Sequence, residues 1–185
     1  MLAGETVAAA DGGSVTTGAG RVVEADMVVA GLGIEPETEL AQAAGLAVDN
    51  GIVVDEFGRA GGRADVFAAG DVASFPVAAL GRRLRVEHED HAKSHGRRVG
   101  EDMAGAGKPY DHLPFFYSDM FELGYEAVGE LDARLVTRER WDEPNHKGIV
   151  AYVDDANRPR GFLFWNVWGK VDAGRELIRA GAPLG

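Results

Sequence analysis

The chain has 185 residues, of which 45% are apolar and 26% charged, so it can bury a core as one medium domain or two small ones. It has no cysteine, no apolar run near the roughly 20 residues that cross a bilayer, and no secretory signal at its start. The net charge of −11 argues against nucleic acid or an anionic membrane as partner. These features predict a cytoplasmic protein with no membrane span, disulfide or thiolate metal site.

The first elements alternate between strand and helix patterns. Residues 7–10 and 15–17 are β-type stretches joined by the turn signal DGG. Residues 25–32 (ADMVVAGL) form a short, almost wholly apolar run that enters a Gly-Leu-Gly loop, which predicts a strand buried on both faces. Residues 35–44 have helical character, and Gly45 is the expected stop.

The middle of the chain carries the most informative pattern. After a short strand at residues 51–55, the run 65–71 passes from apolar residues into Gly-Asp. We expect a buried strand that places Asp71 at its carboxyl end, where ligands of α/β sheets bind. A helix is predicted over residues 87–104, with three apolar side chains near one face: Ala92, Val99 and Met103.

The composition changes after residues 105–109, where Gly-Ala-Gly followed by Lys-Pro cannot continue a helix. We therefore expect a division into residues 1–107 and 108–185. The second part is predicted to be an α+β module with an antiparallel sheet, Asp172 capping a last helix to Ala180. Its four expected strands are residues 125–131, 135–141, 148–153 and 161–168.

The last of these strands is apolar or aromatic on both alternating sets of side chains. Such a strand is expected to be covered on both faces, by a helix, a neighbouring domain or a second subunit. A homodimer is one reading of this pattern.

Three motifs in order give a family resemblance. FAAGDV (residues 67–72) resembles the second FAD-binding motif of the pyridine nucleotide–disulfide oxidoreductase superfamily, in which the Asp binds the ribityl chain. VVAGLGIEP (residues 28–36) resembles the stretch that closes the nicotinamide domain, and AAGLAVDNGIVVDEFGR lies between the two. The resemblance implies an α/β fold: part of a Rossmann-like FAD/NAD(P)-binding domain over residues 1–107, then an α+β C-terminal domain over residues 108–185.

Two further segments resemble the branch that holds the apoptosis-inducing factors and the ferredoxin reductases: GRRLRVEHEDHA and FFYSDMFELGYEAVGEL. This resemblance implies that Glu87 and His88 lie beside the flavin ring and the nicotinamide. Tyr117 would stack near the flavin, and Glu126 would contact the nicotinamide cofactor. The cofactor-binding candidates are Gly33, Gly70, Asp71, Glu87, His88, Glu89, Tyr117 and Glu126.

A helix that begins near Glu87 also has a physical use. Reduced flavin carries negative charge on its ring, and a helix N-terminus offers free N–H groups and the positive end of a dipole. The protein's part in flavin chemistry is to position the ring and tune that charge, so no side chain is expected to act as a nucleophile.

The function implied is the C-terminal portion of an FAD-dependent NAD(P)H oxidoreductase that passes hydride from NAD(P)H to FAD and electrons to an acceptor. The acceptor stays open between a small iron–sulfur protein, as in a ferredoxin or rubredoxin reductase, and a quinone. The chain contains no GxGxxG, the glycine loop that holds dinucleotide phosphates and lies upstream in this family. We therefore expect this segment alone to bind FAD poorly or not at all.

Alternative interpretations use the same residues. His88, His91 and His95 are spaced to share one helix face, and imidazoles are zinc ligands, although one straight helix rarely supplies a whole metal site. A non-catalytic dimerisation module built on the aromatic sheet is a hypothesis from another class. The basic residues between Arg82 and Arg98 are interpreted as a solvated helix face, with a docking patch for an acidic protein as the alternative.

Overall fold

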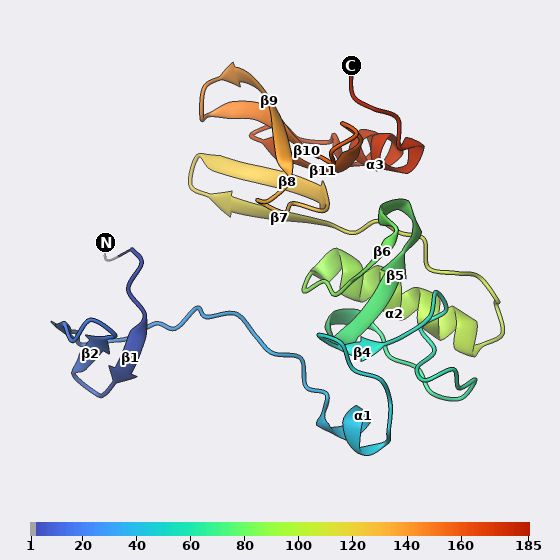
Figure 1. The fold of residues 1–185 in the computed structure, drawn as a ribbon, viewed down its shortest axis with the longest axis horizontal. Coiled ribbons are helices and arrows are strands. Elements are labelled where there is room, and N and C mark those ends of the chain that lie inside the picture. Colours follow the sequence, from blue (N-terminus) through green and yellow to red (C-terminus); the bar gives the residue numbers. More distant parts are fainter. Residues whose placement is uncertain (1–2) are drawn as a thin grey trace. The chain divides into compact units, whose positions relative to one another are not determined.

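The computed structural model describes residues 3–185, and the chain forms two compact units, Met1–Glu35 and Pro36–Gly185 (Figure 1). The first unit contains one antiparallel sheet in the order β1-β2-β3. The predicted hairpin is confirmed, because β1 pairs with β2 in antiparallel. In its turn the Asp11 carboxylate accepts the N–H groups of Gly13 and Ser14 at 2.8 and 2.7 Å. Its strands are β1 (Val7–Ala10), β2 (Ser14–Thr17) and β3 (Val22–Glu24).

The prediction of a buried strand at residues 25–32 is wrong. That segment has no regular structure, and the side chains of Val29 and Leu32 are both 86% exposed. A strand buried on both faces needs a sheet to join and layers that cover those faces, and residues 3–35 provide neither for this segment. The helix expected next is shorter than predicted: α1 spans Glu39–Ala43 and ends before Gly45, whose φ is +74°.

The second unit contains α1 and then a small mixed sheet in the order β4-β5-β6, followed by helix α2 (Figure 1). Strand β4 pairs with β5 in parallel, and β5 and β6 form an antiparallel hairpin. The bounds are β4 (Ile52–Val53), β5 (Ala73–Val77), β6 (Arg82–Leu84) and α2 (Glu89–Met103).

The position of Asp71 corrects the prediction. Residues 65–69 do not form a strand, because their only ladder contact is the isolated bridge from Phe67 to Arg59. Asp71 lies in a single 3-10 turn, η1 (Gly70–Val72), which leads into β5. The carboxylate therefore precedes the buried strand instead of closing it.

The buried face of α2 also differs from the prediction, because Ala92 and Met103 are exposed. The side chains that face the core are His91, His95, Val99 and Asp102. Each polar side chain there has one partner: the Asp102 carboxylate lies 2.7 Å from the Arg59 guanidinium, His91 Nδ1 lies 3.1 Å from the Tyr110 hydroxyl, and His95 Nδ1 lies 3.3 Å from the Gly70 nitrogen. Asp102 Oδ1 and Nε2 of both histidines are buried without a partner within residues 3–185.

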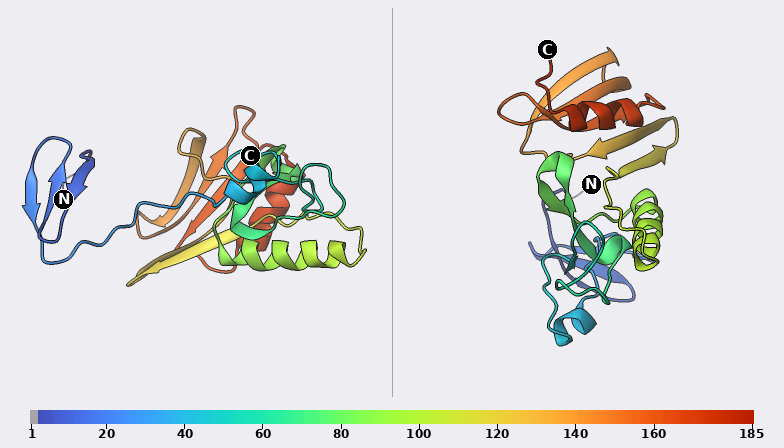
Figure 2. Two further views of the ribbon diagram at one scale, coloured as in Figure 1. Left: turned by 90° about the horizontal axis from the view of Figure 1, so that it is seen from below. Right: turned by 90° about the vertical axis from the view of Figure 1, so that its right-hand side faces the viewer.

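The rest of the unit is a five-stranded antiparallel sheet with helix α3 (Val171–Ala180) packed on one face (Figures 1 and 2). The sheet order is β7-β8-β11-β10-β9, which confirms the predicted α+β module. Only β7, on the aromatic run, is absent from the prediction. The strands are β7 (Phe115–Met120), β8 (Leu123–Gly129), β9 (Val136–Glu143), β10 (Lys147–Val153) and β11 (Pro159–Trp165).

Helix α3 covers only one face of β11. Phe162 and Phe164 are buried beneath it, where Gly174 allows the close approach, whereas Leu163 and Trp165 on the other face are half-buried. The expected cover on both faces is therefore absent among residues 36–185. Asp172 is not the cap either, since α3 begins at Val171; it pairs with Arg175 in the first turn, at 2.8 Å.

A single hydrophobic core joins the two sheets of this unit. Phe75 and Val77 from the first sheet, and Val128 and Phe162 from the second, all belong to it. The division expected at residue 107 stays a prediction. Over residues 3–185 we find no helix with the length and apolar character that crossing a membrane requires.

Candidate functional site

The candidate site centres on the turn that holds Asp71 against α2. Gly70 is buried, and its φ of +72° is a conformation that favours glycine. Its N–H donates to Nδ1 of His95 at 3.3 Å. The next residue, Asp71, is exposed, and its carboxylate accepts no hydrogen bond from the described part of the chain. A carboxylate on a rigid turn with free acceptor oxygens can receive the hydroxyl groups of a ligand.

Arg85 joins this turn to the segment that precedes α2. Its side chain is only 9% exposed, and its Nη2 lies 2.6 Å from the Glu87 carboxylate. Its Nη1 donates to the backbone carbonyl of Asp71 at 3.3 Å, and its Nε donates to the Asn50 side-chain oxygen at 3.2 Å. One guanidinium therefore fixes two candidate site residues relative to each other.

Sequence reasoning missed Arg85, because the density of charge over residues 82–98 favours a solvated helix face. The chain is extended at residues 82–84: Arg82 lies on β6 and pairs with Glu130, and Arg83, on the same strand, donates to the carbonyl of Val54. The available signal is the alternation of arginine with Leu84 and Val86, since a period of two is typical of a strand.

The start of α2 carries no side-chain cap within the described residues. His88 occupies the N-cap position in an extended conformation. Its ring lies 5.0 Å from the ring of Phe116. Glu89 projects outward and pairs with Lys93, whose ammonium lowers the pKa of the Glu89 carboxyl. The free N–H groups and the dipole of a 15-residue helix favour negative charge at this end.

Asp90 fixes strand β7 beside this helix end. Its carboxylate accepts the N–H of Phe115 at 3.2 Å, lies 2.7 Å from Nε2 of His112, and lies 3.6 Å from the guanidinium of Arg175. The first residue of β7 is thus tied directly to the first turn of α2.

Two candidates follow on that sheet, Tyr117 on β7 and Glu126 directly opposite it on β8. The Tyr117 side chain is 50% exposed, so its ring is free to contact a ligand. The Glu126 carboxylate accepts the N–H of Gly169 at 2.8 Å, which fixes its position. The structure therefore places Gly70, Asp71, Glu87, His88 and Glu89 beside the start of α2. Tyr117 and Glu126 face each other on the neighbouring strands β7 and β8.

Gly33 belongs to the N-terminal unit, where its φ is +81°. Its part in the site stays a prediction.

The three histidines do not share a face, because His88 lies outside the helix. His91 and His95 are fully buried with their rings 4.9 Å apart, and burial lowers the pKa of His91 to about 4 and of His95 to about 3. Both are therefore neutral at neutral pH. Within residues 3–185, no three or more His, Asp or Glu side chains are grouped so as to hold a metal ion.

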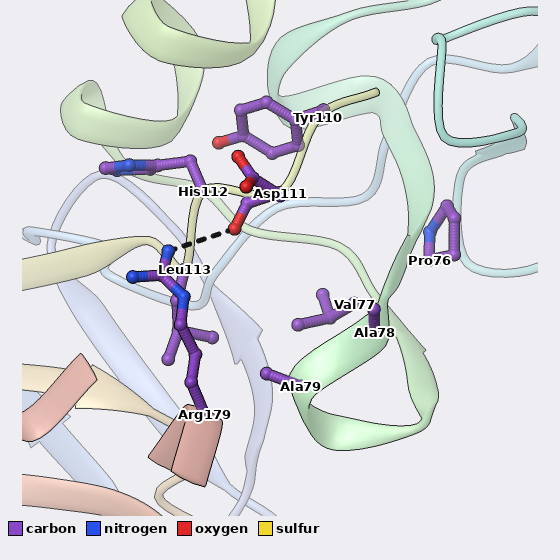
Figure 3. A pocket seen from close by; sticks show the side chains of 9 residues that line it. All are labelled: Pro76, Val77, Ala78, Ala79, Tyr110, Asp111, His112, Leu113 and Arg179. Carbon is purple, nitrogen blue, oxygen red and sulfur yellow. Dashed lines mark hydrogen bonds between the residues drawn. The ribbon is translucent and has the colours of Figure 1, made fainter. Parts of the chain in front are cut away.

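A cavity of about 230 Å³ lies elsewhere, between the β5–β6 hairpin and the segment that leads into β7 (Figure 3). Arg179 lines it and donates from Nη2 to the Asp111 carbonyl at 3.2 Å. Neither Asp71 nor Tyr117 lines this cavity, so it is separate from the candidate site.

Comparison with known proteins decides the family. The sequence profile described as pyridine nucleotide-disulphide oxidoreductase matches residues 1–96, slightly more than half of the chain. The chain belongs to this family. A second profile, for the C-terminal region of mitochondrion-associated apoptosis-inducing factor, matches residues 99–146 of this oxidoreductase-family chain.

Two curated relatives show how much of a family member the chain represents. It is 37% identical over 179 residues to "Apoptosis-inducing factor 1, mitochondrial" of Dictyostelium discoideum, covering 89% of this chain and 33% of the relative. It is 37% identical over 175 residues to the ferredoxin–NAD(+) reductase component of the anthranilate 1,2-dioxygenase system of Burkholderia cepacia, covering 95% of this chain and 43% of the relative. The chain thus spans a third to less than half of these relatives.

Solved structures give the same picture of the fold. The match to the crystal structure of the covalent putidaredoxin reductase–putidaredoxin complex covers 98% of the present chain and 45% of the solved chain, with a TM-score of 0.85 and 28% sequence identity. The mixed α/β architecture with an antiparallel five-stranded sheet is therefore that of a ferredoxin reductase-type oxidoreductase.

Proposed function

We propose that this chain forms the flavin-facing and C-terminal part of an FAD-dependent oxidoreductase that takes hydride from NAD(P)H and passes electrons to an acceptor. The observation that carries the proposal is the free carboxylate of Asp71, held beside the uncapped start of α2 by Arg85 and His95. FAD would contribute the hydride- and electron-accepting chemistry.

The residues present fit FAD. Asp71 offers acceptor oxygens to the ribityl hydroxyls, and Gly70 leaves no side chain between that turn and α2. The uncapped N–H groups after His88 suit the charge that reduced flavin develops. The half-exposed ring of Tyr117 offers an apolar face for stacking, and Glu126 lies directly opposite, where we place the nicotinamide contact.

We propose a small iron–sulfur protein of the ferredoxin type as the acceptor. The proposal is supported by the names of two matches, a ferredoxin–NAD(+) reductase component and a putidaredoxin reductase in complex with putidaredoxin. A quinone is the competing acceptor, and steady-state assays with a [2Fe–2S] ferredoxin and with a soluble quinone would separate the two.

The decisive experiment uses the polypeptide encoded by the complete reading frame. It should purify yellow, and anaerobic addition of NADH or NADPH should bleach the flavin absorbance. A colourless protein that takes up no added FAD would contradict the proposal.

We further propose a cytoplasmic location, consistent with a cysteine-free acidic chain, which cell fractionation would check.

A dimerisation module is the second candidate, and one observation favours it. On the sheet face that α3 leaves open, Tyr125 and Trp165 stack at 5.9 Å, and the buried Nε1 of Trp165 has no hydrogen-bond partner within residues 3–185. A second copy covering this face would bury the half-exposed rings. Sedimentation equilibrium would decide it: a strict monomer would contradict the dimer.

A further inference from the structure

A buried polar cluster lies directly beneath the Asp71 turn. It comprises His91, Ser94 and His95 of α2 together with Tyr110, whose hydroxyl lies 3.1 Å from His91 Nδ1 and 2.9 Å from Ser94 Oγ. Both imidazoles are completely buried, and His91 stacks on Phe75 with ring centroids 4.4 Å apart. Burying polar groups costs free energy unless they are hydrogen-bonded, so packing alone does not explain why four polar side chains gather here.

The cluster reaches the site through one residue, Gly70. The Gly70 N–H donates to His95 Nδ1 at 3.3 Å, and within the described chain that nitrogen is its acceptor. The ring cannot turn away easily, because it is packed against His91 at 4.9 Å and Tyr110 at 4.5 Å. A buried N–H that lost this acceptor would favour another backbone conformation at the residue that immediately precedes Asp71.

The acceptor role requires a neutral imidazole, because a protonated ring has no free lone pair on Nδ1. Burial lowers the pKa of His95 to about 3, and the neighbouring His91 acts in the same direction. The nitrogen is therefore available as an acceptor at neutral pH.

We propose that His95 is a positioning residue for the cofactor: through Nδ1 it holds the Gly70–Asp71 turn in the conformation that presents the Asp71 carboxylate. The inference rests on the function proposed above. Asp71 is the group that would contact FAD, and His95 acts on FAD only through the backbone of Gly70.

The test compares two substitutions in the full polypeptide that binds FAD. His95→Leu fills the space without an acceptor, whereas His95→Asn keeps an oxygen close to the position of Nδ1. Losing one buried hydrogen bond should raise the dissociation constant of FAD about two- to tenfold in His95→Leu. His95→Asn should restore most of the affinity.

A second readout does not depend on the flavin. Amide hydrogen exchange at Gly70, measured without FAD, should be faster in His95→Leu and close to wild type in His95→Asn. His146→Leu is the matched control, because that side chain is 48% exposed and pairs only with Glu143. If His95→Leu does not fold, His95→Gln takes its place, since its amide reaches the position of Nε2 and not that of Nδ1.

The two measurements distinguish failure of the positioning role from failure of the proposed function. Wild-type affinity for FAD in His95→Leu, with faster exchange at Gly70, would overturn the positioning role while leaving the oxidoreductase intact. Equal losses in His95→Leu and His95→Asn would also overturn it, because packing alone would explain them. A wild-type protein that binds no FAD would instead remove the proposed function, and this inference with it.

Discussion

The guanidinium of Arg85 donates to the backbone carbonyl of Asp71 at 3.3 Å, across 14 residues of sequence. The same guanidinium pairs with Glu87 at 2.6 Å, so the turn and the approach to α2 are fixed as one structure. Gly51 makes this possible, because a Cβ there would lie 2.9 Å from Cδ of Arg85. The geometry of the candidate site thus depends on a half-buried cation that would not itself contact the cofactor.

Replacing Arg85 by Leu should lower the free energy of unfolding by about 1.5–3 kcal/mol, the usual cost of losing hydrogen bonds from a charged group. Urea unfolding monitored by circular dichroism measures the change. Arg134→Leu is the control, because Arg134 is 87% exposed and solvent screens its pair with Asp132, so its loss should change stability little. Equal effects of the two substitutions would contradict the role assigned to Arg85.

Replacing Asp71 by Ala should weaken FAD binding about ten- to a hundredfold, since a charged acceptor of hydroxyl groups is lost. The folded protein should be little changed, because the carboxylate has no partner among the described residues. Flavin fluorescence titration gives the dissociation constant. Asp65→Ala, an exposed carboxylate paired with Arg63, should leave FAD affinity at the wild-type value. Unchanged affinity in Asp71→Ala would remove Asp71 from the site.

Acid should destabilise the protein through the two buried histidines. In the unfolded chain an imidazole titrates near 6.5, whereas burial lowers the pKa of His91 to about 4 and of His95 to about 3. Between these values the unfolded state binds more protons, so stability is fully present above pH 6.5 and falls as the pH drops through the folded values. The slope should approach ~1.4 kcal/mol per pH unit for each imidazole.

Urea midpoints at pH 7.5, 6.0 and 5.0 would measure this slope. His95→Asn should show a shallower dependence, because one of the two titrating groups is gone. A variant that tracks the wild type at every pH would show that His95 does not contribute to the acid sensitivity.

The pair of Arg59 and Asp102 should be important for attaching residues 55–68 to α2. The Asp102 side chain is fully buried and lies 2.7 Å from the guanidinium, so Arg59→Leu should cost about 3–5 kcal/mol of stability. Arg59→Leu combined with Asp102→Leu should recover part of that loss, because no carboxylate then remains buried without its partner. A double variant as unstable as the sum of the single ones would argue against this account.

The sequence by itself determined the features that depend on neighbours in the chain. The hairpin at Asp11 and helix α2 follow from local turn chemistry and local propensity, and the FAAGDV motif indicated the family before any contact was known.

The tertiary structure alone decided which groups are buried and against what. Residues 25–32 carry the apolar pattern of a buried strand but find no neighbouring strand within their unit, and Asp71 lies before β5 because Gly70 turns the chain there. His95 and Arg85 look like surface residues in the sequence, yet His95 is buried and the Arg85 side chain is only 9% exposed, because residues 25 and 14 positions away provide their partners. Burial and pKa depend on such contacts between distant residues, and a local pattern does not contain them.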